Sequence, residues 1–250
     1  MTELVHLEVA DELATITLDS PHNRNALSRQ LLTELSAHLQ SAADDERVKV
    51  VLIRSADRVF CSGADLTEVT GPDAAAEGVK AIVQLQRFLA TLPKPVVVQL
   101  QGPVRAGGLG IVGSADIVVA AESVNFALTE VRLALAPSVI SLSLLTRFTS
   151  RAAADLFLTG RTFDAAEAAQ VGLITRVVPD DQLVEEIAAV VTDLRAGFPQ
   201  GHRETKWLLN HDLVARIDAL GDEVAAQSAR LFGSDEAREA ITAFLSKGKA

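Results

Sequence analysis

Val104-Arg-Ala-Gly-Gly-Leu-Gly110 is the stretch of this chain that decides its fold. It lies between two apolar runs, 96–100 and 117–121, and each run predicts a buried strand. Two adjacent glycines after a strand can turn backbone N–H groups toward a ligand, because no Cβ stands in the way. The segment from Gly107 to Ser114 has room for only about two turns of helix before the next strand begins.

A second glycine-bearing turn, Phe60-Cys-Ser-Gly-Ala-Asp65, follows another apolar run, Val50-Val-Leu-Ile-Arg54. Two turns of this kind, each at the end of a strand, can supply one N–H donor each to a single oxygen atom. Two such donors are the minimum needed to stabilise an oxyanion. We therefore expect the two turns to meet.

Length and composition restrict the class of protein. The 250 residues suffice for one large domain, or for a large domain with an appendage, and 48% hydrophobic residues predict an ordinary buried core. The net charge of −10 disfavours nucleic acid and anionic membranes as main partners. No apolar run approaches the ~18 residues of a membrane span, and the first residues do not resemble a signal peptide. The single cysteine, Cys61, predicts a cytoplasmic location.

Strand-like and helix-like segments alternate along the first half, and the second half is mostly helical. We expect strands at 5–9, 13–18, 48–54, 96–100, 117–121 and 174–178. We expect helices at 28–43, 74–92, 107–114, 183–194, 204–220, 222–232 and 235–245, with a short helix that starts at Asp164 and ends before Gly172. The pattern predicts an α/β body of repeated strand-strand-helix units over residues 1–195. A helical region over 196–250 follows, with the boundary near 196–201.

Gly108-Leu-Gly110-Ile-Val-Gly113 also matches the dinucleotide fingerprint G-x-G-x-x-G. The helix that follows is too short for that fold, and the motif lies in the middle of the chain rather than near its start. The chain also contains no tyrosine, which the common short-chain dehydrogenases use in catalysis. A nicotinamide cofactor is therefore disfavoured, and the other explanation of these glycines is close helix packing.

Several motifs occur together in a fixed order. They are Ser20-Pro-His-Asn-Arg-Asn-Ala-Leu27, Phe60-Cys-Ser-Gly-Ala-Asp-Leu66, Val104 to Gly110, Phe126-Ala-Leu-Thr-Glu130 with Pro137 after it, Leu158-Thr-Gly-Arg-Thr-Phe-Asp164 and Ala169-Gln-Val-Gly-Leu-Ile174. The set resembles the crotonase superfamily, the enoyl-CoA hydratases and isomerases. The resemblance implies a spiral of ββα units with a C-terminal helical region, assembled as trimers or dimers of trimers. It also implies acyl-CoA thioester substrates, with coenzyme A as part of the substrate and no separate cofactor.

The resemblance assigns catalytic roles to Ala64, Gly107 and Glu130. The N–H groups of Ala64 and Gly107 would form the oxyanion hole, and Glu130 would be the acid and base. Glu130 stands in an apolar run, where burial would raise its pKa. From the residues alone, a salt bridge to Arg132 or a solvated position are the other possibilities for Glu130.

One position departs from the family pattern. Well-known hydratases carry a second glutamate three residues after the oxyanion glycine, where this chain has Gly110. Either Glu130 alone serves a hydratase, or it moves one proton along the acyl chain in a double-bond isomerase. Some hydratases of branched, methylglutaconyl-type thioesters also carry glycine there. The context of Thr129 and of residues 136–141 resembles that group, which favours a hydratase.

The resemblance also suggests where the acyl-CoA binds. The expected substrate-binding residues are Arg24, Ala26, Ser62, Asp65, Leu66, Gly108, Gly110, Phe244 and Lys247. Arg24 would meet a phosphate, whereas Phe244 and Lys247 resemble positions that reach a neighbouring chain's nucleotide. Pocket walls are expected from residues 67–85. No metal is expected, because the histidines are scattered without ligand spacing.

Three other functions stay open at this stage. The chain could be a non-catalytic acyl-CoA binder, because the second glutamate is missing. An RNA-binding relative is disfavoured by the net charge of −10. A thioester hydrolase on the same fold has no specific support in the sequence.

Overall fold

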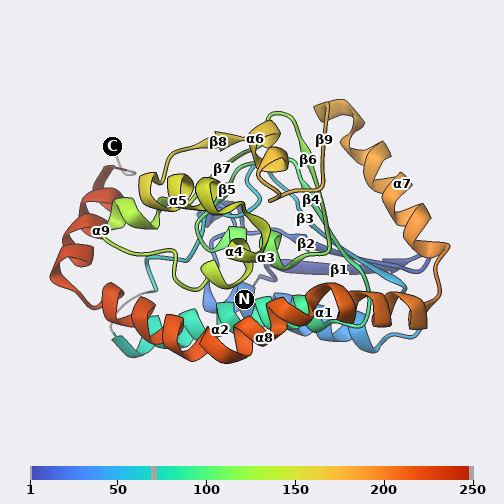
Figure 1. The fold of residues 1–250 in the computed structure, drawn as a ribbon, viewed down its shortest axis with the longest axis horizontal. Helices are drawn as coiled ribbons and strands as arrows, with labels where there is room; N and C mark the ends of the chain where they lie inside the picture. Colours follow the sequence, from blue (N-terminus) through green and yellow to red (C-terminus); the bar gives the residue numbers. More distant parts are fainter. Residues whose placement is uncertain (1, 69–71, 248–250) are drawn as a thin grey trace.

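The computed structural model describes residues 2–68 and 72–247, and for residues 72–74 and 247 it describes the backbone only. Its main sheet has the strand order β1-β2-β3-β4-β6-β9 (Figure 1). The strand bounds are Val5–Ala10, Leu13–Leu18, Val50–Ser55, Val96–Leu100, Ile117–Ala121 and Arg176–Val178. Strand β1 pairs with β2 in an antiparallel hairpin, and every other neighbour pair is parallel. All six predicted strands are confirmed, with bounds shifted by at most two residues.

A second, smaller sheet has the order β5-β7-β8, with bounds Val104–Arg105, Asn125–Ala127 and Phe163–Asp164. Isolated bridges extend this layer from Leu27 to Ala64 and from Cys61 to Val104. The chain therefore passes repeatedly from a strand of the main sheet to the second layer and then into a helix. This repeat is the predicted ββα spiral. These small strands were not predicted, because two or three residues carry no readable periodicity.

Nine α-helices and three 3₁₀ helices appear in the described part of the chain. The α-helices are α1 Arg29–Asp44, α2 Pro72–Thr91, α3 Gly108–Ser114, α4 Ser141–Arg147, α5 Ser150–Thr159, α6 Ala165–Gln170, α7 Leu183–Arg195, α8 Pro199–Phe232 and α9 Asp235–Lys247. The 3₁₀ helices are η1 Pro21–Asn23, η2 Thr129–Leu133 and η3 Asp180–Gln182. Two caps are confirmed: Ser28 accepts from the N–H of Leu31, and Asp164 accepts from the N–H of Glu167. Helices α4 and α5 were not predicted.

The prediction of two helices over 204–220 and 222–232 is wrong, because α8 runs unbroken through Gly221. Gly221 is buried, and a Cβ built on it would lie 3.1 Å from Cγ1 of Val83 in α2. The glycine therefore allows α8 to approach α2 closely. Glycine costs a helix about 1 kcal/mol relative to alanine, and burial of apolar surface between the two helices offsets that cost.

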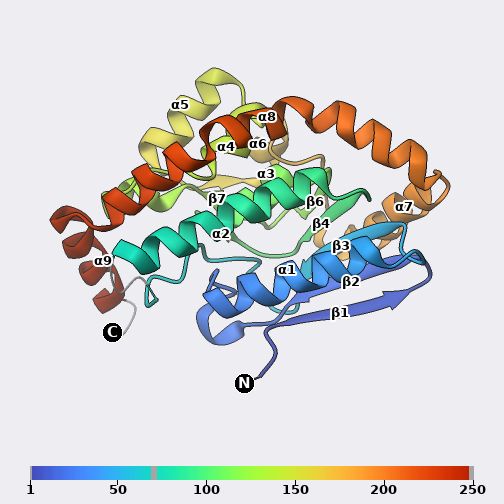
Figure 2. The ribbon, with the colours of Figure 1, turned by 90° about the horizontal axis from the view of Figure 1, so that it is seen from below.

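Helices α1, α2 and α8 lie along one side of the molecule, and Figure 2 shows α2 between the other two. Buried polar groups anchor α8: Nζ of Lys206 lies 2.7 Å from Oδ2 of Asp116, and Nδ2 of Asn210 donates to Oδ1 of the same Asp116. The C-terminal half of α8 and helix α9 are thereby carried toward the loops after the strands. The boundary between 1–195 and 196–250 stays a prediction, although α7 ends at Arg195. Within the described residues, no helix is both long and apolar enough to cross a bilayer.

Candidate active site

The two glycine-bearing turns meet because of one backbone pairing. Cys61 and Val104 form a parallel bridge, and the N–H of Arg105 donates to the carbonyl of Cys61 at 2.9 Å. In a parallel pairing, residues at equal offsets from the bridge lie side by side. Ala64 and Gly107 both stand three residues after it. A Cβ built on Gly107 would lie 3.6 Å from the backbone nitrogen of Ala64.

The N–H groups of Ala64 and Gly107 donate to no acceptor among the described residues. Their neighbours do: Ala106 donates to the carbonyl of Ala127 at 3.1 Å, and Leu109 donates to the carbonyl of Ala106 at 2.9 Å. Ala64 and Gly107 both line the main pocket, and Gly107 is buried. Because buried N–H groups are rarely left without a partner, this pair is a ready site for a ligand oxygen.

Side chains hold the first turn in place. Ser62 donates to the carbonyl of Asn23 at 3.0 Å, and Asn23 donates to Asp65 at 3.0 Å. Burial raises the pKa of Asp65, but hydrogen bonds from Thr67 and Asn23 outweigh burial and keep the pKa below its ordinary value. Gly63 has φ of +100°, and a Cβ there would lie 2.9 Å from Cβ of Ala106. Only glycine fits at this crossing.

Glu130 stands in η2, directly after β7, whose pairing with β5 brings it to the same layer as Gly107. It lines the main pocket, and its Oε2 is buried without a hydrogen-bond partner among the described residues. Glu130 forms no ion pair with Arg132 or with any other cation among the described residues. Burial raises the pKa of Glu130 to about 7, although a backbone hydrogen bond works in the opposite direction. Near neutral pH, this carboxyl group can therefore both accept and release a proton.

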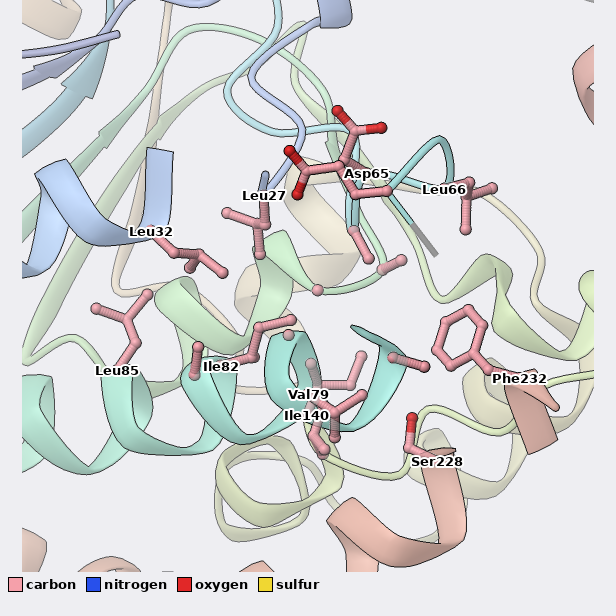
Figure 3. Close-up of a pocket in the computed structure, with 18 of the residues that line it drawn as sticks. Leu27, Leu32, Asp65, Leu66, Val79, Ile82, Leu85, Ile140, Ser228 and Phe232 are labelled. Carbon is pink, nitrogen blue, oxygen red and sulfur yellow. The ribbon is translucent and has the colours of Figure 1, made fainter. Parts of the chain in front are cut away.

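The pocket beside these groups has a volume of about 690 Å³. Figure 3 shows Leu27, Asp65 and Leu66 on one side of it, opposite Val79 and Ile82 of α2 and Ile140, with Phe232 and Ser228 at one end. Such a volume suits a ligand of the size of a cofactor or drug molecule. The walls come partly from residues 67–85, as expected from the sequence.

The structure brings some of the predicted site residues together and leaves others apart. Ser62, Ala64, Asp65, Leu66, Gly107, Glu130 and Phe244 line the pocket. Arg24 is exposed with a left-handed backbone, Ala26 is buried, and neither lines the pocket. Phe244 lines the pocket of its own chain. Lys247 ends α9, and its side chain lies outside the described part of the structure.

Gly108 and Gly110 serve packing in this structure rather than lining the pocket. A Cβ on Gly108 would lie 2.7 Å from Cβ of Cys61. A Cβ on Gly110 would lie 3.2 Å from Cγ2 of Ile140 and 3.3 Å from Cδ of Gln86. A side chain at residue 110 would therefore require Ile140 and the buried Gln86 to shift by a few tenths of an ångström.

Gln86 also fixes the wall next to Glu130. Its Nε2 donates to the carbonyl of Val139 at 3.0 Å, and its Oε1 accepts from the hydroxyl of Ser143 at 2.7 Å. This buried network joins α2 to α4 and to the loop that follows η2. The sequence shows a polar residue in an otherwise amphipathic helix, but it does not show which segment that residue meets.

Reasoning from the sequence missed several lining residues. They are Leu27, Val139, Ile140, Ser228 and Phe232. Val79, Ile82 and Leu85 recur at three-residue spacing, a signal that predicts one buried helix face. Nothing local predicts that Ser228 and Phe232, far along the chain, fold back beside it.

No cluster of three metal-ligating side chains occurs in residues 2–68 and 72–247. The thiol of Cys61 is buried, and burial raises its pKa to about 12. It is therefore a packed residue rather than a nucleophile at neutral pH.

Comparisons with known proteins give the family of this chain. Residues 8–250 match the family model described as enoyl-CoA hydratase/isomerase. The crystal structure of an enoyl-CoA hydratase from Mycobacterium avium is 42% identical with a TM-score of 0.92, covering 99% of this chain and 98% of that chain. The human enoyl Coenzyme A hydratase domain-containing protein 3 is 28% identical with a TM-score of 0.81, at 98% coverage of both chains. The 2,3-dehydroadipyl-CoA hydratase of Escherichia coli K12 is 29% identical, covering 99% of this chain and 97% of the relative.

Glu130→Gln is expected to raise the free energy of unfolding at pH 8 and to leave it nearly unchanged near pH 4.5. The folded-state pKa of about 7 exceeds the ordinary value of 4.5, so the folded state holds the proton more tightly than the unfolded state. The free energy of unfolding of the native protein therefore falls by roughly 2–3 kcal/mol as pH rises from 4.5 to 8. Glutamine stays neutral over this range, so the variant does not lose this stability. Urea unfolding at both pH values measures this, with the exposed Glu122→Gln as control. An equal effect at both pH values would contradict the assignment.

Gly110→Glu is expected to lower the free energy of unfolding by about 2 kcal/mol or more, because its Cβ would press against Ile140 and Gln86 and its carboxylate would start from a buried position. Gly78→Ala in α2 is the control, since a Cβ there meets nothing within 4 Å. It should be neutral or stabilising by up to about 1 kcal/mol. Urea unfolding of the two variants provides the comparison, and a fully stable Gly110→Glu protein would show that the space is open.

Proposed function

Since the chain belongs to the enoyl-CoA hydratase/isomerase family, we propose that it is an enoyl-CoA hydratase, which adds water across the double bond of a 2-enoyl-CoA thioester. One observation carries the proposal: two N–H groups without acceptors lie in the same pocket as a buried carboxyl group whose Oε2 has no hydrogen-bond partner among the described residues. Donors that point at one oxygen and a carboxyl group with a pKa near 7 are what a hydration through an enolate requires.

In the proposed reaction, the thioester carbonyl oxygen accepts hydrogen bonds from the N–H groups of Ala64 and Gly107. Glu130 takes a proton from water while the water oxygen bonds to the β-carbon. The electron pair of the double bond then moves toward the carbonyl oxygen, where the two N–H groups stabilise the negative charge. Glu130 returns a proton to the α-carbon, so water is added and the carboxylate is regenerated. Loss of one such donor typically costs about 10²–10³ in rate.

For the coenzyme A portion, we propose contacts with the turn at 62–66 and with Phe244, which line the pocket. The guanidinium of Arg24 has no ion-pair partner among the described residues and is free to meet a phosphate. Ala26, Gly108, Gly110 and Lys247 stay predictions as substrate-binding residues. Coenzyme A is then part of the substrate, and no further cofactor takes part in the proposal.

A double-bond isomerase is the second candidate, and Gly110 is the observation that favours it. Moving a double bond needs one group that removes a proton and returns it elsewhere on the acyl chain, so a single carboxyl group suffices. A hydratase consumes the conjugated double bond of crotonyl-CoA and its ultraviolet absorbance. Persistent absorbance with active protein would favour the isomerase.

We further propose that the chain assembles as a trimer or a dimer of trimers in the cytoplasm. Three consecutive apolar side chains on α8, those of Trp207, Leu208 and Leu209, are 61–73% exposed. Large apolar side chains with this exposure favour burial against another chain. The single cysteine supports the proposed cytoplasmic location, because it can form no disulfide within the chain.

Glu130→Gln is expected to lower kcat for crotonyl-CoA hydration by about 10²–10⁴, because the amide can neither accept nor release the proton. The affinity for butyryl-CoA, measured by titration calorimetry, should change by less than about threefold, since the pocket keeps its shape. Glu122→Gln, on the surface, is the matched control and should keep full activity. Turnover by Glu130→Gln at the native rate would remove Glu130 from the reaction.

Light scattering is expected to give a mass of three or six times the 26.5 kDa of one chain. Leu208→Glu places a charge on the exposed apolar surface of α8 and should shift the assembly toward the single chain. Thr205→Glu, on an exposed position of the same helix, is the control. A native protein that stays at the mass of one chain at all concentrations would contradict the proposed assembly.

A further inference from the structure

The pocket extends in two directions from Leu27, whose Cδ1 lies 3.1 Å from a Cβ built on Gly107. In Figure 3, Leu32 and Leu85 lie on one side of Leu27, and Leu66, Phe232 and Ser228 lie on the other. We name the first direction, between α1 and α2, the aliphatic arm. The outer arm is the second direction, toward α8 and α9.

The aliphatic arm is lined next to the proposed oxyanion site by buried side chains of carbon and hydrogen only. Leu27, Leu32, Ile82 and Leu85 are each at most 6% exposed. Figure 3 shows the side chains of Ile82 and Leu85 on α2 facing Leu32 on α1. Farther along the same two helices, the lining continues with Phe88 and the uncharged Ser36, Gln40 and Gln84.

The two arms differ in charge. The carboxyl groups that line the pocket are those of Asp65, Glu68, Glu77 and Glu130, and Figure 3 shows Asp65 on the same side of Leu27 as Leu66. Arg29 is the one cation among the described side chains that line the pocket, and it is largely exposed and lies 3.3 Å from Glu77. Residues 69–74 contain no lysine or arginine. No described cation of this chain is therefore placed to neutralise a carboxylate buried in the aliphatic arm.

The length of the arm follows from helix geometry. A Cβ built on Gly107 would lie 3.7 Å from Cδ1 of Ile82, and Phe88 stands six residues later on α2. Six residues of α-helix advance by about 9 Å. A staggered alkyl chain advances by roughly 1.25 Å per bond. The arm therefore accommodates an acyl chain of about eight carbons.

We propose that the aliphatic arm binds the acyl chain, and that the substrates are CoA thioesters of uncharged aliphatic acids of medium length. Acyl groups that end in a second carboxylate, such as the glutaconyl-type groups considered from the sequence, are disfavoured. The inference rests on the proposed function in one respect, that the ligand is an acyl-CoA. It assigns the specificity for chain length to the α1–α2 side of the pocket, with Ser36 near its far end.

Binding to the native chain tests the inference without requiring turnover. Titration calorimetry should show octanoyl-CoA binding at least about tenfold more tightly than butyryl-CoA, because four additional methylene groups are buried. Adipyl-CoA should bind at least about tenfold more weakly than hexanoyl-CoA, since its terminal carboxylate would be buried without a cation. Equal affinity for the four thioesters, or tighter binding of adipyl-CoA, would overturn the proposal.

A bulky side chain introduced into the aliphatic arm tests whether the acyl chain binds there. Ser36→Phe should lower the affinity for octanoyl-CoA by at least about tenfold and change that for butyryl-CoA by less than about threefold. Ala37→Phe, the same change at the next and exposed residue of α1, is the control and should alter neither value. Circular dichroism checks that both variants are folded. If a folded Ser36→Phe protein binds octanoyl-CoA as tightly as the native chain, the acyl chain lies in the outer arm and the proposal fails.

Rates separate this inference from the proposed function. If crotonyl-CoA is hydrated but octanoyl-CoA binds no better than butyryl-CoA, the hydratase stands and the chain-length inference fails. If octanoyl-CoA binds as expected but no enoyl-CoA is hydrated, the binding site stands and the proposed reaction fails.

Discussion

The parallel bridge between Cys61 and Val104 is the constraint on which the site depends. The bridge pairs two segments that lie more than forty residues apart in the sequence. Ala64 and Gly107 each follow it by three residues, so their N–H groups lie close together, and neither donates to a described acceptor. The two turns pack closely: a Cβ built on Gly63 would lie 2.9 Å from Cβ of Ala106. Glycine at 63 and at 108 is needed for the turns to close to this distance. A side chain at either position would push the two donors apart.

Glu130 reaches the same place through a second pairing, that of β7 with β5. The spiral of ββα units therefore stacks its functional groups: the passages through Cys61, β5 and β7 are followed by Ala64, Gly107 and Glu130, which line one pocket. Burial raises the pKa of Glu130 to about 7, and no cation in the described residues offsets that effect. The fold thus holds a carboxyl group in an environment that disfavours its charge, a condition that structural stability alone would not select.

The sequence predicted much of this arrangement where the signal was local. All six strands of the main sheet, the caps at Ser28 and Asp164, and the two glycine turns follow from apolar runs and turn residues. The predicted break at residue 221 is absent, because α8 packs along α2 and Gly221 leaves room there for Val83. No local pattern predicts the short strands β5, β7 and β8, because they form only by pairing with distant segments. The same holds for the residues of α8 that line the pocket, because they depend on how α8 packs against the rest of the chain. The roles of Ala64 and Gly107 came from resemblance, because a backbone donor leaves no side-chain signature.

The carbonyl stretching frequency of a bound thioester tests the central claim most directly, because it reports on the hydrogen bonds to the carbonyl oxygen. Butyryl-CoA labelled with ¹³C at the thioester carbon binds without reacting, and difference infrared spectroscopy isolates its carbonyl band. Two N–H donors at one oxygen should move this band to a lower wavenumber than in water. A band at the same position as in water, or at a higher wavenumber, would show that the N–H groups of Ala64 and Gly107 do not converge on the substrate.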